Sequence, residues 1–339
     1  MAGIREIAEM TGLSVATVSH VINNTRQVSK RSRELVEKAI EEIGYKPNRA
    51  ARMLRTQQSK TMAMIIPRVR PGMSTNVFFM DVLSGAKDYL QTKGYNMIVS
   101  TYTEEEGEGT DELRDLEVLK QQWVDGILIV PNKKKQTLFA DVMESGIPFV
   151  VLDRLVTDIP SPCVCSDNVS AARKAVKLLY NSGKRRIGYI GGSPDSFTGH
   201  DRYQGYCDGL AECGLTLDET LVSLSQKHTV RSGSEGADQL LEHHADAIFV
   251  ANDVKAVGVL KALNQRGVRV PEDVGVIGFD DYEWMEISSP PLTTIRQNPY
   301  LMGQEGARLL LRHIEDPNCA ERIVLDTEIV RRRSHGKEE

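Results

Sequence analysis

The sequence predicts a small all-α domain followed by an α/β core of two similar subdomains, and three observations predict this fold class. Three helical patterns separated by glycine breaks fill the first 45 residues. From Thr61 onward, apolar runs alternate with helical stretches, which is typical of parallel sheets covered on both faces. The length of 339 residues also exceeds what one compact core usually holds.

The composition is that of an ordinary globular protein, with 40% hydrophobic and 26% charged residues. No apolar run approaches the ~20 residues needed to cross a bilayer. The start MAGIREIAEM lacks the pattern of a signal peptide. Five cysteines without a C-x-x-C pair favour reduced thiols over a disulfide framework or a zinc site. We therefore expect a cytoplasmic protein that contains no metal.

The charge is divided unevenly along the chain. The first 60 residues hold 11 Lys and Arg against 6 Asp and Glu, a net charge of +5, so the remainder of a chain totalling −5 carries −10. A basic end before an acidic body indicates contact between that end and a polyanion.

Each helical pattern of the first domain has recognisable ends. The first begins at Ile4 and breaks at Gly12, and the second follows Ser14, a favourable N-cap. The third starts after Ser29, carries a single apolar stripe and stops at Gly44. Two helices joined by a tight turn, followed by a third, favour a helix-turn-helix domain; a plain three-helix bundle is the alternative.

The segment YKPNRAARMLRTQQSKT connects this domain to the body. Pro47 ends one element and Asn48 can cap the next, whereas RAARMLR is long enough for only two helical turns. Because helices this short are marginal in water, the segment is predicted to order only against a partner.

Seven apolar runs predict the strands of the body: AMIIP, NMIVS, GILIV, FVVL, IGYIGG, AIFVA and VGVIGF. Helical stretches such as VLSGAKDYLQTKG and AARKAVKLLYNSG separate them. The strands are too many for one small sheet, so we expect two subdomains, with the chain crossing near residues 161–167 and returning near 288–297. Ligands of open α/β sheets bind at the carboxyl ends of strands, which predicts a cleft between the subdomains.

Motifs for catalysis and nucleotide binding are missing from the sequence. The stretch GGSPDS lacks G-x-G-x-x-G, and no phosphate loop, G-x-S-x-G elbow or H-E-x-x-H occurs. The adjacent Asp280 and Asp281 are suited to catalysis, yet such carboxylates equally accept hydrogen bonds from ligand hydroxyls. Binding without chemistry is the simpler interpretation, so we expect neither an enzyme nor a cofactor.

Three long stretches, GLSVATVSHVIN, VSKRSRELVEKAIEEIGYKPNRAARMLR and NDVKAVGVLKALNQRGVRVPEDVGVIGFDDYEWMEISSPPLTTIRQ, closely resemble the LacI/GalR family of bacterial transcription regulators. The likeness runs from about Ile4 to Arg333. It implies a DNA-binding headpiece over 1–46, with its motif at about 4–23, and a hinge helix and linker over 47–60. It also implies a core over 61–339 of two Rossmann-like subdomains resembling periplasmic sugar-binding proteins. We expect the N-subdomain at about 61–162 and 290–325, and the C-subdomain at about 163–289 and 326–333.

The resemblance assigns base contacts to Val15, Ala16 and His20. A small apolar surface can meet a thymine methyl, and an imidazole can bond a purine edge. The family commonly has Arg where this chain has His20, and many members have a better cap than Gly3, so the first helix is expected to be weakly capped. One further predicted DNA-binding residue, Ser14, begins the recognition helix. The others resemble the family's phosphate contacts, which set the register of the protein on DNA and do not read its sequence: Thr17, Ser19, Asn23, Asn24, Ser29, Tyr45 and Asn48.

The hinge segment contributes three further predicted DNA contacts, Ala51, Leu54 and Arg55. Leu54 resembles the family's hinge leucine, which wedges with its dimer mate into the minor groove and kinks the DNA. An ordinary buried leucine is the alternative, but RAARML has no second apolar stripe to bury it.

For the cleft, the resemblance implies an effector site suited to a polyol or sugar, with carboxylates and an arginine for hydroxyls and an aromatic ring for an apolar face. His228 stands where relatives often have a stacking aromatic, and with Arg231 nearby this leaves room for a sugar acid. A purine-like corepressor also stays open. The predicted effector-binding residues are Phe78, Phe79, Asn132, Asp153, Thr198, Arg202, His228, Asn252 and Asp280.

The function predicted in this way is a homodimeric repressor of a carbohydrate catabolic operon. Two headpieces would read a pseudo-palindromic operator, and a sugar or sugar-acid effector would change operator affinity. The end RRRSHGKEE lacks leucine heptads, so a dimer is the expected limit. The sign of the effector is open, with an inducer expected. A global carbon-control regulator with a protein partner stays as an alternative, whereas a transport protein and a sugar kinase fit the motifs less well.

Overall fold

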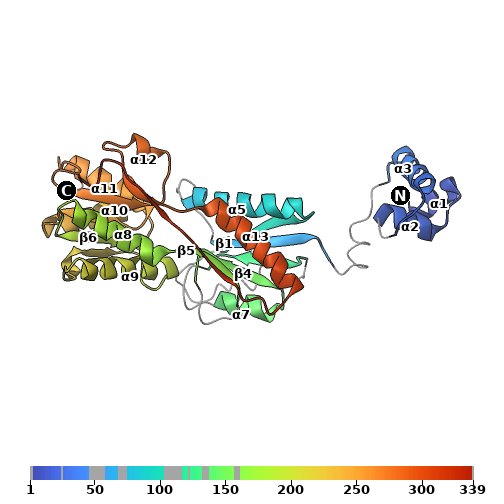
Figure 1. Cartoon of the computed structure of the whole chain (residues 1–339), viewed down its shortest axis with the longest axis horizontal. Helices are drawn as coiled ribbons and strands as arrows, with labels where there is room; N and C mark the ends of the chain where they lie inside the picture. Colours follow the sequence, from blue (N-terminus) through green and yellow to red (C-terminus); the bar gives the residue numbers. More distant parts are fainter. Residues whose placement is uncertain are drawn as a thin grey trace. The chain divides into compact units, whose positions relative to one another are not determined.

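A computed structural model of the chain describes residues 3–23, 26–45, 58–67, 75–102, 117–120, 123–131, 137–155 and 161–337. The chain forms two compact units, Met1–Ser59 and Lys60–Glu339 (Figure 1). None of the described helices is long and apolar enough to span a membrane.

The first unit contains the three predicted helices: α1 (Ile4–Thr11), α2 (Val15–Asn23) and α3 (Lys30–Ile43). α1 ends at Gly12 and α3 at Gly44, with φ angles of 67° and 62° that glycine adopts without strain. The Ser29 hydroxyl caps α3 by accepting a hydrogen bond from the Ser32 amide at 3.2 Å. No side chain caps α1 at Gly3, as expected. The helix-turn-helix prediction is confirmed.

The second unit contains two sheets of six strands each within the residues described. The first has the order β11-β5-β4-β3-β1-β2 and is parallel throughout. The second has the order β12-β10-β9-β8-β6-β7 and is parallel except for the antiparallel pair β10 and β12. All seven apolar runs form strands, so the predicted parallel α/β core is confirmed.

The strands of the first sheet are β1 (Thr61–Pro67), β2 (Asn96–Tyr102), β3 (Gly126–Ile129), β4 (Phe149–Leu152), β5 (Cys163–Ser166) and β11 (Arg322–Leu325). The strands of the second are β6 (Ile187–Gly191), β7 (Val222–Leu224), β8 (Ala247–Val250), β9 (Gly275–Phe279), β10 (Thr293–Arg296) and β12 (Glu328–Val330).

Helices pack on both faces of each sheet, as the apolar clusters show. On the first sheet, α5 (Thr75–Thr92) and α13 (Pro299–Glu315) cover one face, and α6 (Glu117–Lys120) and α7 (Thr137–Glu144) the other. On the second, α8 (Asn168–Asn181) and α9 (Phe197–Glu212) cover one face. The opposite face carries α10 (Val230–Glu242), α11 (Asp253–Gln265) and α12 (Trp284–Ile287), and the short helix η1 (Glu219–Leu221) precedes β7.

Glycine lets α5 and α13 approach closely (Figure 1). A Cβ atom built on Gly303 would lie 1.9 Å from the Val82 carbonyl oxygen, and one on Gly85 would lie 1.9 Å from the Tyr300 oxygen. Any larger residue at either position would push the helices apart. This contact matters for function because the two helices carry parts of the pocket described below.

Strand pairing contradicts two of the predicted subdomain boundaries. β5 begins at Cys163, where the second subdomain was expected to start, yet it pairs with β4 and β11 in the first sheet. β10 lies inside the range 290–325 predicted for the first subdomain, yet it pairs with β9 in the second sheet. The predicted boundaries are therefore wrong by one strand at each crossing, since the sequence pattern identifies a strand but not its neighbour.

Candidate functional site

The start of α2 is held by a local cap. The Ser14 hydroxyl accepts a hydrogen bond from the Thr17 amide at 3.1 Å and lies 2.8 Å from the Thr17 hydroxyl. The predicted N-cap is thereby confirmed. Because Ser14 is exposed at the N-terminus of a helix, where backbone N–H groups favour anions, it is also placed to meet a phosphate.

Helix α2 has a buried face and an exposed face. Val18 and Val21 are buried against α1 and α3, whereas the Val15 side chain is 47% exposed. Ala16 is exposed beside it, and His20 is half-buried one turn further on. A small, uncharged and partly apolar surface at the start of a recognition helix is suited to the edges of bases.

The other predicted DNA contacts of the headpiece have varied surroundings. Ser29 is exposed, Thr17 and Ser19 are half-buried, and Tyr45 packs against the headpiece core. Asn23 lies in the last turn of α2. Six predicted site residues lie outside the described part of the chain: Asn24, Asn48, Ala51, Leu54, Arg55 and Asn132.

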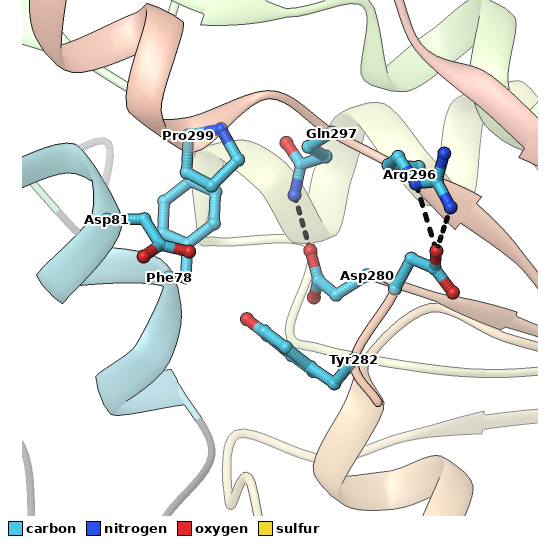
Figure 2. Close-up of a pocket in the computed structure, with 8 residues that line it drawn as sticks. Phe78, Asp81, Asp280, Tyr282, Arg296, Gln297 and Pro299 are labelled. Atoms are coloured by element: carbon cyan, nitrogen blue, oxygen red, sulfur yellow. Dashed lines mark hydrogen bonds and ion pairs between the residues drawn. The ribbon is translucent and has the colours of Figure 1, made fainter. Parts of the chain in front are cut away.

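The second unit contains a pocket at the carboxyl ends of β9 and β10 (Figure 2). One wall comes from α5, the opposite wall from the loop after β9, and the third from the segment that joins β10 to α13. Elements of both sheets therefore enclose it, which agrees with a cleft between the subdomains. The lining residues are Phe78, Asp81, Asp280, Asp281, Tyr282, Arg296, Gln297 and Pro299.

The two adjacent aspartates have different surroundings. Asp281 forms ion pairs with Arg296 and Arg332, each at 2.7 Å. Asp280 forms no ion pair with any residue described, and burial raises the pKa of its carboxyl to about 6. Asp281 thus ties the crossing strands together, while Asp280 is left to a ligand.

Gln297 adds a second acceptor to the same pocket. Its Nε2 donates to the Asp280 carboxylate at 2.6 Å, and Figure 2 shows the two side chains facing each other. Its Oε1 is buried and has no partner among the described groups. A buried oxygen of this kind is costly unless a donor meets it, so it indicates where a ligand O–H or N–H would bind.

Arg202 is buried in the second unit and contacts three groups there. Its Nε donates to Asn168 Oδ1 at 2.8 Å and its Nη1 to the Ala251 carbonyl at 2.8 Å. The guanidinium carbon lies 3.5 Å from the centroid of the Phe279 ring. Its positive charge partly offsets the burial that raises the pKa of Asp280. Only 8% of Arg202 is exposed, so its orientation is determined before any ligand arrives.

Asp153 lies beyond the end of β4 with an unusual φ angle of 63°. It is buried and paired with Arg154, yet its Oδ1 has no hydrogen-bond partner in the described structure. The charge of Asp153 raises the pKa of Asp280, after burial and Asp253, which indicates that the two carboxylates lie near each other. The charges of Asp153 and Arg202 thus act on Asp280, which lines the pocket together with Phe78.

His228 lies between cations. Burial, and then the charges of Lys255, Arg202 and Arg154, lower the pKa of His228 to about 4. Its Nδ1 is buried and has no partner among the described residues. The imidazole is therefore neutral at physiological pH and offers a nitrogen to a ligand rather than a charge.

Two other predicted effector residues have structural contacts, and a third lies at the start of a helix. Phe79 is buried in the core and packs edge-to-face on Phe78, with ring centroids 5.6 Å apart. Asn252 Oδ1 caps α11 by accepting from the Lys255 amide at 3.1 Å. Thr198 is half-buried in the first turn of α9.

Arg231, which suggested an anionic ligand, is 87% exposed and paired with Glu235 at 2.7 Å, so this part of the sugar-acid argument fails.

Five pocket residues escaped the sequence argument: Asp81, Tyr282, Arg296, Gln297 and Pro299. Asp81 follows Phe78 by three residues and so shares its helix face, which was a usable signal. Tyr282 follows Asp280 by two residues; burial and the nearby Asp280 raise its pKa, so it stays a phenol able to donate. Gln297 had no signal, because its importance depends on the strand that it follows.

Two protein-family models match the chain, one over its first domain and one over its core. The model of the LacI family of bacterial regulatory proteins matches residues 3–48, and that of periplasmic binding protein-like domains matches 176–335. The chain is 35% identical to the transcriptional regulator CelR of Thermobifida fusca, over 97% of this chain and 96% of that protein. It is 32% identical to the repressor PurR of Vibrio atlanticus, over 98% of each.

Two solved structures extend these similarities. A complex of CelR with cellobiose has a TM-score of 0.74 at 33% identity, covering 98% of this chain and all of that one. A lac repressor dimer bound to operator and an anti-inducer has a TM-score of 0.85 at 26% identity, covering 99% of both chains.

Proposed function

The chain belongs to the LacI family of bacterial regulatory proteins and is a DNA-binding transcriptional regulator rather than an enzyme. From this premise we propose that it represses a carbohydrate catabolic operon and responds to a neutral sugar bound in the cleft. The observation that carries the proposal is the set of buried acceptors of Asp153, Asp280 and Gln297, with the phenol of Tyr282 and the guanidinium of Arg202 as donors acting near Asp280. Sugars present many O–H donors, which such a set satisfies.

We propose that operator sequence is read by Val15, Ala16 and His20. Their support is the exposed, uncharged start of α2, whose opposite face is buried in the headpiece core. The remaining predicted contacts would hold phosphates. Leu54→Ala is expected to weaken operator binding through loss of the hinge wedge, and an unchanged affinity in a gel shift would count against that role.

A neutral ligand fits the charges of the cleft better than a sugar acid. Arg154 is paired with Asp153, and the charge of Arg202 is offset by Asp280 nearby. His228 is held neutral, and Arg231 points to solvent. A carboxylate placed beside Asp81 and Asp280 would meet repulsion rather than a counter-charge. A purine corepressor stays as a second candidate because PurR is nearly as similar to this chain as CelR is.

We propose a homodimer that reads two half-sites, as in the operator-bound lac repressor dimer. Support comes from apolar side chains left exposed on α5 and on the edge strand β2. Val77 and Met80 are 44% and 53% exposed, and Ile98 and Val99 are 39% and 46% exposed. Partner burial of this surface would remove the solvent exposure. Acting on chromosomal DNA, the dimer would reside in the cytoplasm.

The mechanism requires two states of the core that differ in effector affinity. A ligand shifts an equilibrium only as far as its affinities for the two states differ. We propose that the sugar favours the state with lower operator affinity, which makes it an inducer.

A thermal-shift screen of the full-length protein against neutral sugars, sugar acids and purines tests the effector class. A gel shift with an operator fragment, with and without the best ligand, then gives the sign. We expect neutral sugars, cellobiose among them, to raise the midpoint and to release DNA. Asp280→Asn should weaken this response, while Asp281→Asn should mainly lower stability. A hit confined to purines that tightens DNA binding would instead establish the corepressor alternative.

A further inference from the structure

We infer that Lys255 is a positioning residue of the effector cleft, which clamps the loop that carries His228 to the end of β6. The inference rests on the proposed function, because it assigns a role in effector binding. Nothing in the sequence indicated this residue, which lies in the first turn of α11.

The geometry of Lys255 is that of a buried clamp. Its side chain is fully buried, with 0% exposed. Its Nζ donates to two backbone carbonyls, those of Gly191 and Ser225, the latter at 2.8 Å. Gly191 ends β6, and Ser225 directly follows the end of β7 at Leu224. One ammonium group therefore joins the carboxyl ends of two neighbouring strands to the start of a third element.

The loop after β7 is held at two points just before His228. Lys255 binds it at the Ser225 carbonyl, while the Ser232 hydroxyl binds it at the Lys227 carbonyl at 2.7 Å. The loop after β6 meets the same imidazole, since a Cβ atom built on Gly192 would lie 3.5 Å from His228 Cε1. Lys255 thus determines where the unpartnered Nδ1 of His228 stands relative to the cleft.

The charge of Lys255 has a separate effect on the same imidazole. Lys255 forms no ion pair with any described residue, and burial lowers the pKa of its own ammonium to about 8. The groups whose charges act on His228 are Lys255, Arg202 and Arg154, and all of them lower the pKa of the imidazole. Removing Lys255 would leave two of these three cations, so the imidazole should protonate at a higher pH.

A purely structural role predicts different behaviour. Lys255→Met removes the cost of burying an unpaired ammonium group, but it also removes the donor to two backbone carbonyls. Because these two effects oppose each other, we expect the free energy of unfolding to change little. If Lys255 only supported the fold, hydrogen exchange of the loops and effector affinity would change only as far as the free energy of unfolding changes. If it positions the loops, they should loosen in a protein that is otherwise intact.

The test compares Lys255→Met, Lys255→Gln and the control Lys261→Met, an exposed lysine of the same helix, in the full-length protein. Amide hydrogen exchange of residues 225–229, measured without effector, should accelerate about tenfold in the Met variant. The Gln variant can still donate to one carbonyl and should show a smaller increase. NMR titration of the His228 ring should show a raised pKa in both variants, because both lack the cation. The control should match the parent protein.

Calorimetry with cellobiose as the probe gives the functional result. The Kd should rise about tenfold in Lys255→Met and less in Lys255→Gln, while operator affinity without sugar stays unchanged. Unchanged exchange in residues 225–229 and an unchanged His228 titration in a folded Lys255→Met protein would overturn the inference. Failure of the parent protein to bind cellobiose would count against the proposed sugar instead, and the exchange and titration results would still decide the role of Lys255.

Discussion

The headpiece and the cleft are built in opposite ways. In the headpiece, the contacts that set the start of α2 are local: Ser14 bonds Thr17, and the preceding helix ends at Gly12. In the cleft, partners come from distant parts of the chain. Phe78 and Asp280 line one pocket, and Arg202 reaches Asn168 and Ala251. A substitution in a surface built from sequence neighbours should disturb few other residues. A substitution in a cleft built from distant segments should disturb several of the residues that line it.

The largest expected effect is therefore in the cleft, at Arg202. Replacing it by Met removes two buried charge-assisted hydrogen bonds, at a cost of about 3 kcal/mol, and removes the positive charge near Asp280. We expect sugar affinity to fall about 100-fold, measured by calorimetry. Arg173→Met is the control, because Arg173 pairs with Glu212 at the surface. Equal sugar affinities of the two variants would refute a role for Arg202 in sugar binding.

A change in the headpiece should act on DNA alone. His20→Ala is expected to reduce discrimination at one base position by about 2 kcal/mol, roughly 30-fold, with the response to sugar intact. Competition gel shifts with operators varied at single positions measure it. Met10→Ala on α1, which is 48% exposed, serves as the control. A uniform loss over all operator positions would show that His20 contacts the backbone instead.

The pH dependence of sugar binding tests the coupling inside the cleft. Burial holds the pKa of Asp280 at about 6, above the ordinary value of a carboxyl. The ionised form is thus disfavoured by the fold but is the better acceptor for sugar hydroxyls. Ionisation of Asp280 therefore lowers the stability of the fold as pH rises toward 6, whereas it raises the affinity for sugar over the same range.

We accordingly expect sugar affinity to fall about tenfold between pH 7 and pH 5, measured by calorimetry in the full-length protein. Asp280→Asn should bind weakly with a flat profile over this range. A profile that is flat in the parent protein would mean that Asp280 does not contact the sugar.

The smallest expected effect is at a headpiece cap. Ser29→Ala removes the acceptor for the Ser32 amide and should lower headpiece stability by about 1 kcal/mol, as urea unfolding would show. Ser29→Asp keeps a capping oxygen and should retain most of that stability. A loss of several kcal/mol in the Ala variant would mean that the cap is coupled to more than its own helix.

The sequence was sufficient for the headpiece helices and for the kinds of element in the core. Apolar spacing, caps at Ser14 and Ser29 and breaks at Gly12 and Gly44 act over a few residues, so one sequence contains all the partners needed. The seven apolar strands were found for the same reason. Of the polar residues that line the pocket, the sequence singled out the pair Asp280 and Asp281, and the effector-binding role of Asp280 came from resemblance to a family.

Tertiary structure alone decided which of those residues face a ligand. Asp280 and Asp281 are identical side chains in adjacent positions, and only strand pairing brings Arg296 and Arg332 to one of them. Arg231 is carried to solvent, Gln297 to the pocket and Lys255 to the interior. Burial and long-range partners determine the charge and the hydrogen-bonding capacity of a side chain, and neither is a property of its neighbours in the sequence.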